Sequence, residues 1–306
     1  MISNLSPSAE SFMANIDRLQ RTVEQASQQA SSGKRVNVAS DAPEDVAAIL
    51  QLRSDEVRNT QIQSNLGLAK TEADAADNAL NEATKLMDRA RTLGAQGANF
   101  TLDATGRQSL AQEVESLMDQ MLSVSRTTVQ GRYIFSGDQD DAPALDIDLS
   151  QPTGIITLTN ATATRRVEDA SGGTFAVTQN ARQIFDTRND DDTPAADNVF
   201  GALNSLRVAL QNNDTDGINA GVQSVQLASN RINTAQAFYG SVENRIQDAV
   251  NYSSSYDTEL KTELSQKEDA DVTSAAMTLT AGMTQLQAAF QMQGRMPRTT
   301  LFDYIA

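Results

Sequence analysis

Apolar residues recur at alternating spacings of three and four near both ends of the chain, and this period predicts α-helices with one apolar face. The seam near the start consists of Phe12, Ile16, Leu19, Val23, Ala26 and Ala30. The seam near the end consists of Val272, Ala276, Leu279, Met283, Leu286 and Phe290. Each seam needs a partner helix to bury it. The pattern therefore predicts terminal helices that pair with each other or with other copies, and it favours an assembly subunit over a catalyst.

The same period predicts further helices between these two. We expect helices over about 7–31, 43–93, 105–130 and 199–211, then a long one after a turn at 212–217, and a last one from about 271. Pro7 and Pro43 suit first turns, Gly33 suits the end of the first helix, and Gly94 and Gly97 suit the end of the second. The second helix has the longest seam, which consists of Ile62, Leu66, Ala69, Ala73, Ala76, Leu80, Ala83, Met87 and Ala90.

The segment from about 132 to 198 has a different pattern. Short apolar clusters at 133–135, 155–158 and 175–177 alternate with turn residues such as Gly137, Pro152 and Gly172. Such clusters predict β-hairpins. The predicted fold is thus mainly α with a β-rich insert, an elongated antiparallel helical bundle built from N- and C-terminal arms. We expect three domains, 1–42 plus 265–306, 43–137 plus 199–264, and the solvent-facing insert 138–198.

Composition excludes several classes of function. The chain of 306 residues has no Cys and no His, so disulfides, thiolate metal sites and His-activated nucleophiles are excluded. Its net charge of -16 repels nucleic acid and anionic lipid, so we expect no nucleic-acid binding. No apolar run approaches the ~18–20 residues that a membrane span needs, so we expect no membrane insertion. We expect no cofactor and no metal. The first residues, 1–5, lack the basic and apolar regions of a cleaved signal peptide.

Two acidic segments offer alternative chemistry. Residues 212–217 resemble half of an EF-hand loop, but Asn212 and Gln223 stand where calcium-binding loops have carboxylates. The insert contains Asp138, Asp140, Asp141, Asp146 and Asp148. A secreted acidic hydrolase or a metal-binding protein is therefore an alternative, but solvated acidic loops explain both segments with fewer requirements.

Four motifs in order resemble bacterial flagellins and their junction-forming homologues. They are Ser32–Asn37 followed by Ala39–Pro43, Gly131–Gly137, Gly240–Ile246, and Leu301–Ile305. The last is similar to the end of the junction-forming members of the family. The motif residues are Gly33, Arg35, Asp41, Arg132, Tyr133, Phe135, Gly137, Asn244 and Arg245.

The resemblance implies a structural subunit of the flagellum, not an enzyme. It implies an extracellular location reached through flagellar type III export without a cleaved signal. The partners it implies are other copies of the chain, a neighbouring hook-associated protein and flagellin, and a cytosolic export chaperone. We expect the assembly interface to comprise Leu5, Phe12, Ile16, Leu19, Val23, Leu279, Met283, Leu286, Phe290, Leu301, Phe302, Tyr304 and Ile305.

Within the family, two functions stay open. One is the junction between hook and filament, which the resemblance favours, and the other is the filament itself. A cytosolic coiled-coil binding protein is an alternative from another class.

Overall fold

The computed structural model describes residues 7–159, 161 and 163–295. The helices are α1 (Pro7–Ser32), α2 (Pro43–Gly97), α3 (Ala104–Ser125), α4 (Ala181–Ile184), α5 (Val199–Gln211), α6 (Thr215–Glu268) and α7 (Val272–Arg295). The strands are β1 (Thr128–Val129), β2 (Arg132–Tyr133), β3 (Leu145–Ile147), β4 (Ile155–Thr157), β5 (Arg166–Glu168) and β6 (Thr174–Ala176). The chain divides into two compact units. Unit 1 combines Met1–Arg58 with Tyr256–Ala306, and unit 2 is Asn59–Ser255.

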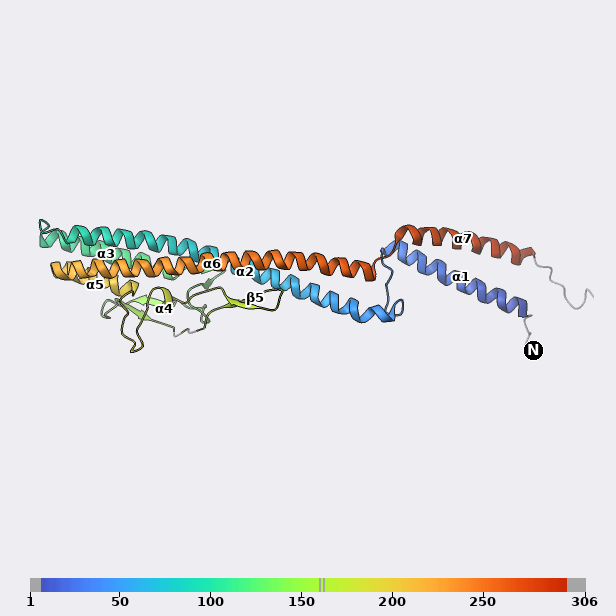
Figure 1. Ribbon diagram of the computed structural model, residues 1–306, viewed down its shortest axis with the longest axis horizontal. Helices are drawn as coiled ribbons and strands as arrows, with labels where there is room; N and C mark the ends of the chain where they lie inside the picture. The colour runs from blue at the N-terminus through green and yellow to red at the C-terminus, as the bar shows by residue number, and fades with distance from the viewer. Residues whose placement is uncertain (1–6, 160, 162, 296–306) are drawn as a thin grey trace, which may run out of the picture. The chain divides into compact units, whose positions relative to one another are not determined.

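In unit 2, α2, α3, α5 and α6 run side by side (Figure 1). α2 and α6 are antiparallel, because Asn59 bonds to Ser253 at one end while Arg91 bonds to Gln226 at the other. Asn59 Nδ2 donates to the Ser253 carbonyl over 2.9 Å, and Ser253 Oγ donates to Asn59 Oδ1 over 2.6 Å. Both side chains are buried, so this pair fixes one register of the two helices.

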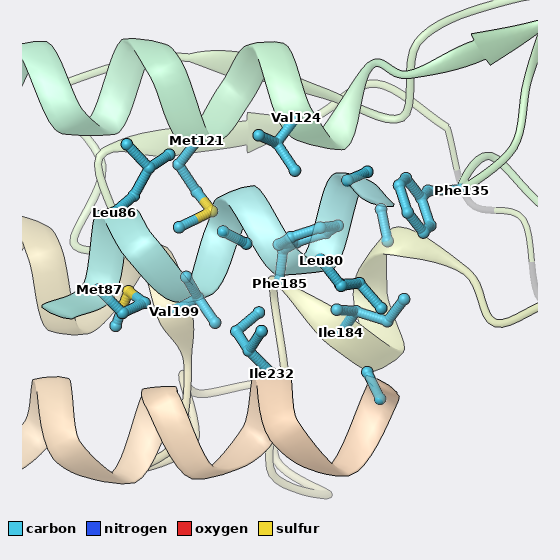
Figure 2. Close-up of a cluster of buried hydrophobic side chains, with 14 of the residues drawn as sticks. Leu80, Leu86, Met87, Met121, Val124, Phe135, Ile184, Phe185, Val199 and Ile232 are labelled. Atoms are coloured by element: carbon cyan, nitrogen blue, oxygen red, sulfur yellow. The ribbon is translucent and has the colours of Figure 1, made fainter. Parts of the chain in front are cut away.

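The predicted α2 seam is the centre of the unit 2 core. All nine of its members are buried, from Ile62 at 6% exposure to Ala90 at 0%. Five of the nine are alanines, whose small side chains let neighbouring helices approach closely. Around Leu80 and Met87, side chains from α3, α4, α5 and α6 converge, including Met121, Ile184 and Ile232 (Figure 2).

The described part of the chain contains three antiparallel two-stranded sheets. The β1–β2 sheet precedes the insert, and the β3–β4 and β5–β6 sheets lie within it. In the second, Asp146 is opposite Ile156, and in the third, Val167 is opposite Phe175. The predicted hairpin character is confirmed. Strands β1, β3 and β5 and helix α4 were not predicted.

One predicted helix end was wrong. α3 ends at Ser125 instead of near residue 130, because Thr128 pairs with Tyr133 in the β1–β2 sheet. α2 continues through Gly94 and ends at Gly97, the second of the two glycines expected to end it, and both glycines lie close to side chains of other helices. The two compact units divide within α2 and α6, so the proposed boundaries at 42 and 265 and the three-domain division stay a prediction.

Candidate assembly interface

The terminal helices α1 and α7 pack against each other within unit 1 (Figure 1). On α1, the predicted seam residues Phe12, Ile16, Leu19 and Val23 are all half-buried, and Ala26 is buried. Every other described side chain from Glu10 to Gln28 is exposed. The predicted seam is therefore the least exposed face of α1, while its part in an assembly interface stays a prediction.

The contact face of α7 differs from the predicted one by a small rotation. Leu279 and Leu286 are half-buried as expected, but Ala275 and Gly282 are the buried residues beside them. A Cβ atom on Gly282 would lie 2.5 Å from Val23 Cγ2, so the two backbones approach closely here. Small residues pack where the hydrophobic pattern alone predicts larger ones.

The remaining predicted seam residues of α7 form an exposed stripe. This stripe, which we call the α7 stripe, consists of Val272, Ala276, Met283 and Phe290. Val272 is 48% exposed, Met283 51% and Phe290 50%. They do not lie at the centre of the α1 contact, so their predicted part in an assembly interface stays a prediction.

The helix that carries the α7 stripe has no charged side chain over most of its length. No charged residue occurs from 272 to 294. A groove runs beside the stripe, lined by Val272, Ala276, Met277, Thr280 and Thr284. Helices with apolar residues on more than one side bury them against more than one partner, and exposed apolar patches mark interaction sites.

The remaining residues of the predicted assembly interface lie outside the described residues. They are Leu5, Leu301, Phe302, Tyr304 and Ile305.

The first motif forms the connection from α1 to α2. Gly33 ends α1 with a φ of +72°, a left-handed conformation that glycine adopts without steric cost. Arg35 Nη2 forms an ion pair with Asp45 over 2.9 Å. Asp41 Oδ2 accepts the backbone N–H groups of Asn37 and Val38, both over 2.9 Å, and holds the turn before α2. The predicted motif residues are thus structural.

The second motif joins the helices to the insert. Phe135 is fully buried and meets Phe185 edge to face, with ring centroids 5.4 Å apart. Gly137 has a φ of +62°, and a Cβ there would lie 2.7 Å from the Ala163 carbonyl oxygen. Tyr133 is half-buried, and its N–H bonds to the Asp140 carbonyl over 2.8 Å. Arg132 Nε pairs with Asp140 Oδ2 over 2.9 Å.

The third motif lies on α6, where Asn244 and Arg245 are both exposed. The Arg245 guanidinium carbon lies 4.4 Å from the centroid of the Phe175 ring. This cation–π contact connects α6 to strand β6 of the insert.

Most carboxylates of the insert have individual partners. Asp140 pairs with Arg132, Asp146 pairs with Arg126 over 2.8 Å, and Asp148 accepts the Ser150 N–H over 3.0 Å. Hydrogen bonds from the Ser150 side chain hold the pKa of Asp148 below its ordinary value. Among the described residues, no group of three or more carboxylates could hold a metal ion.

Two buried ionisable groups lie beneath the insert. Burial raises the pKa of Glu72 despite its ion pair with Arg165. Burial also raises the pKa of Tyr239 to about 12, and its hydroxyl oxygen accepts the Gln179 N–H over 3.1 Å. Both groups connect helices to the insert, which accounts for their positions without any catalytic role.

Comparison with known proteins decides the family. The model of the bacterial flagellin N-terminal helical region matches residues 2–140, and that of the C-terminal helical region matches residues 222–305. The chain belongs to the bacterial flagellin family. Flagellins and their hook-associated relatives are structural components of the flagellum, not enzymes.

Relatives within the flagellin family include both kinds of subunit. Flagellar hook-associated protein 3 of Salmonella typhimurium is 26% identical over 209 residues, which is 66% of this chain and 64% of that protein. Flagellin of Clostridium tyrobutyricum is 27% identical over 186 residues, 58% of this chain and 49% of that protein. The matches thus span less than two thirds of these relatives' own lengths.

A solved structure supports the fold. Flagellar hook-associated protein 3 from Legionella pneumophila has a TM-score of 0.61 at 14% identity, over 71% of this chain and 98% of that one. In the described part of this flagellin-family chain, no helix is long and apolar enough to cross a membrane.

Several contributors to unit 1 were not among the predicted residues, including Ala275, Gly282 and Glu268. Ala275 and Gly282 were missed because small side chains carry little hydrophobic signal. Glu268 was missed because a single charge at a helix end predicts no distant partner.

Proposed function

We propose that this chain is a structural subunit of the bacterial flagellum that forms the junction between hook and filament, and that it assembles through its terminal helices. The observation that supports it most directly is the α7 stripe, whose apolar side chains are about half exposed beside an uncharged groove. The relatives that are named hook-associated protein 3 favour the junction over the filament.

The mechanism we infer is packing of one copy on another. Within one copy, α1 covers only one side of α7, and the α7 stripe stays exposed. Burial of apolar surface stabilises association by roughly 25 cal/mol for each Å² removed from water. A neighbouring copy that covers the α7 stripe would therefore complete the packing of α7.

The proposed partners follow from this role. They are other copies of the chain, a neighbouring hook-associated protein and flagellin, and a cytosolic export chaperone that binds before export. The proposed location is the extracellular flagellum, reached by export without a cleaved signal peptide.

The test is the variant Met283→Asp. It places a charge in the α7 stripe without touching the buried face of α7, so the folded subunit should persist while incorporation into flagella is lost. The matched control is Gln285→Asp, which adds the same charge to an exposed position on another side of the same helix. Incorporation is measured in sheared flagella, and folding is measured by circular dichroism. Normal incorporation of Met283→Asp would contradict the proposal.

The second candidate function is filament formation, which the flagellin from Clostridium tyrobutyricum favours. Seeded polymerisation of the purified protein at high salt, viewed by electron microscopy, separates the two. Long filaments would support the filament function, and short or absent ones from a folded subunit would support the junction function.

A further inference from the structure

The chain crosses between helices twice in unit 1, and the two crossings bond directly to each other. Arg35 N–H and Val36 N–H donate to the Glu268 carbonyl over 2.7 and 3.3 Å. In return, Ala270 N–H donates to the Gly33 carbonyl over 2.9 Å. The connection from α1 to α2 is thereby fixed to the connection from α6 to α7.

The side chain of Glu268 strengthens this junction of crossings. Only 2% of it is exposed, and its Oε1 accepts from Lys34 Nζ and from Arg53 Nη2, the latter over 2.6 Å. Burial by itself would raise the pKa of Glu268, but the hydrogen bonds from Lys34 and Arg53 outweigh it and hold the pKa below its ordinary value. Glu268 is therefore a buried anion between two cations, and charge-assisted bonds of this kind are the strong ones.

A second carboxylate completes the arrangement. Asp45 accepts from Arg35 Nη2 over 2.9 Å and from Lys267 Nζ over 3.2 Å. Arg35 Nη2 also donates to the Lys267 carbonyl over 2.6 Å. We call the set Lys34, Arg35, Asp45, Arg53, Lys267 and Glu268 the crossing clamp.

The α1–α7 pair needs such a fixed point because its own packing specifies register weakly. Its large contact residues are only half-buried, its buried ones are small, and small residues alternate with larger ones along α7. A slip of one helical turn moves one helix by about 5.4 Å and still places seam residues opposite seam residues, because they are three or four residues apart. The crossing clamp lies at one end of both helices. The path from Gly33 to Val23 is about 15 Å at about 1.5 Å per residue, and the path from Ala270 to Gly282 is about 18 Å. Val23 and Gly282 therefore lie at similar distances from the crossing clamp, which agrees with the close approach of the two residues.

We propose that Glu268 is a positioning residue for assembly. It fixes the two crossings to each other and so sets the register in which α1 and α7 pair. The register in turn determines where the α7 stripe lies relative to α1, and thus the surface that neighbouring copies contact. The inference about register concerns the single chain, and only its last step rests on the proposed function.

The register can be measured with a disulfide, because the chain has no cysteine of its own. The Cβ built on Gly282 lies 3.8 Å from Val23 Cβ, which is the mean separation in disulfides. The double variant Val23→Cys with Gly282→Cys should therefore oxidise readily. Leu19→Cys with Gly282→Cys reports a pairing slipped by one turn.

The test introduces Glu268→Gln into both cysteine pairs. This change keeps the shape and removes the charge, so oxidation of the Val23 and Gly282 pair should slow by about ten- to hundredfold, the range for loss of a charge-assisted hydrogen bond. Oxidation of the Leu19 and Gly282 pair should rise. Tryptic cleavage after Lys34 and Arg35 should also accelerate. Glu263→Gln, an exposed residue of the same helix, is the matched control and should change none of these rates.

Unchanged oxidation and cleavage in Glu268→Gln would overturn the proposal, as would rapid cleavage after Lys34 in the unaltered chain. If register changes but Glu268→Gln enters flagella normally, the positioning role in assembly is overturned while the proposed function stands. Failure of the proposed function shows separately, as normal incorporation of Met283→Asp. Slipped register together with lost incorporation would support the whole inference.

Discussion

The core of unit 2 and the α1–α7 pair of unit 1 have the same heptad spacing and very different burial. In unit 2, Leu66, Leu80 and Met87 are 0% exposed. In unit 1, the equivalent positions Leu19 and Val23 are only half-buried. A seam therefore predicts a helix and its contact face, but the number of neighbouring elements decides how much apolar surface is removed from water.

The difference has an energetic consequence. A fully buried Leu or Phe side chain contributes about 1.5–3 kcal/mol through removal from water, and a half-buried one contributes proportionally less. Most of the stability of a helix in a protein comes from tertiary packing of its apolar face, so the stability of α1 and α7 depends on their contacts. Unit 2 has the contacts to be stable by itself, whereas the terminal pair gains from every additional contact, including those of the crossing clamp.

The largest expected effect is Phe135→Ala in unit 2. Phe135 contacts Phe185 and Tyr239 edge to face in a fully buried cluster, so its truncation should lower the free energy of unfolding by about 3–5 kcal/mol. Urea denaturation followed by far-ultraviolet circular dichroism measures it. Leu19→Ala in the half-buried seam should cost only about 1–2 kcal/mol. The control is Phe100→Ala, at a side chain 92% exposed, which should change stability by less than about 0.5 kcal/mol. Equal costs for Phe135 and Leu19 would contradict the comparison.

A smaller effect is expected for Gly282→Leu in unit 1. The new side chain would collide with Val23 where the two helices are closest, so it should destabilise the α1–α7 pair by about 1–3 kcal/mol and leave unit 2 unchanged. Hydrogen exchange of the amides of α1 and of α2 reports the two units separately.

The control for this prediction is Ala281→Leu, at the exposed neighbouring position, which should leave exchange in α1 unchanged. Val23→Ala should partly restore protection in the Gly282→Leu variant, because it removes the atom that collides. Slow exchange in α1 of Gly282→Leu would show that the helices do not meet at this residue.

The sequence was most informative where the hydrophobic period was long. The nine-membered α2 seam is buried throughout, and the short helix 199–211 was located to the residue. Helix α4 was missed because four residues are too few for a period, although its capping box of Asn180 and Gln183 was a local signal. Met283 was predicted to face α1 because a hydrophobic pattern gives more weight to large apolar side chains. In the structure, α7 instead approaches α1 most closely at Gly282, which has no side chain.

The crossing clamp has no counterpart in the sequence pattern. Glu268 is 234 residues from Lys34 and 215 from Arg53, and nothing in a local window distinguishes it from the exposed Glu263. Its role follows only from burial and from the convergence of two chain crossings. Long-range ion pairs of this kind are fixed by topology, which hydrophobic periodicity predicts only in outline.

The smallest expected effect contrasts the pH dependence of two buried glutamates. The pKa of Glu72 in unit 2 is raised by burial from the unfolded value of 4.5, whereas that of Glu268 in unit 1 is lowered by its two cations in spite of burial. The stability that Glu268 contributes is therefore complete above about pH 4.5 and is lost as the pH falls through its folded pKa. Glu72 has the opposite sign, since the folded state loses stability as the pH rises from 4.5 through its raised pKa.

Unfolding of Glu268→Gln and Glu72→Gln between pH 3 and pH 7 separates the two signs. Relative to the unaltered chain, Glu268→Gln should be less stable at pH 7 and approach it at pH 3, because the protonated glutamate has lost the same charge. Glu72→Gln should gain relative stability as the pH rises. Hydrogen exchange near each residue assigns the change to its unit. If the free energy of unfolding of the two variants changed with pH in the same way, burial would dominate the pKa of both glutamates. Glu268 would then resemble a core carboxylate instead of an ion-paired anion.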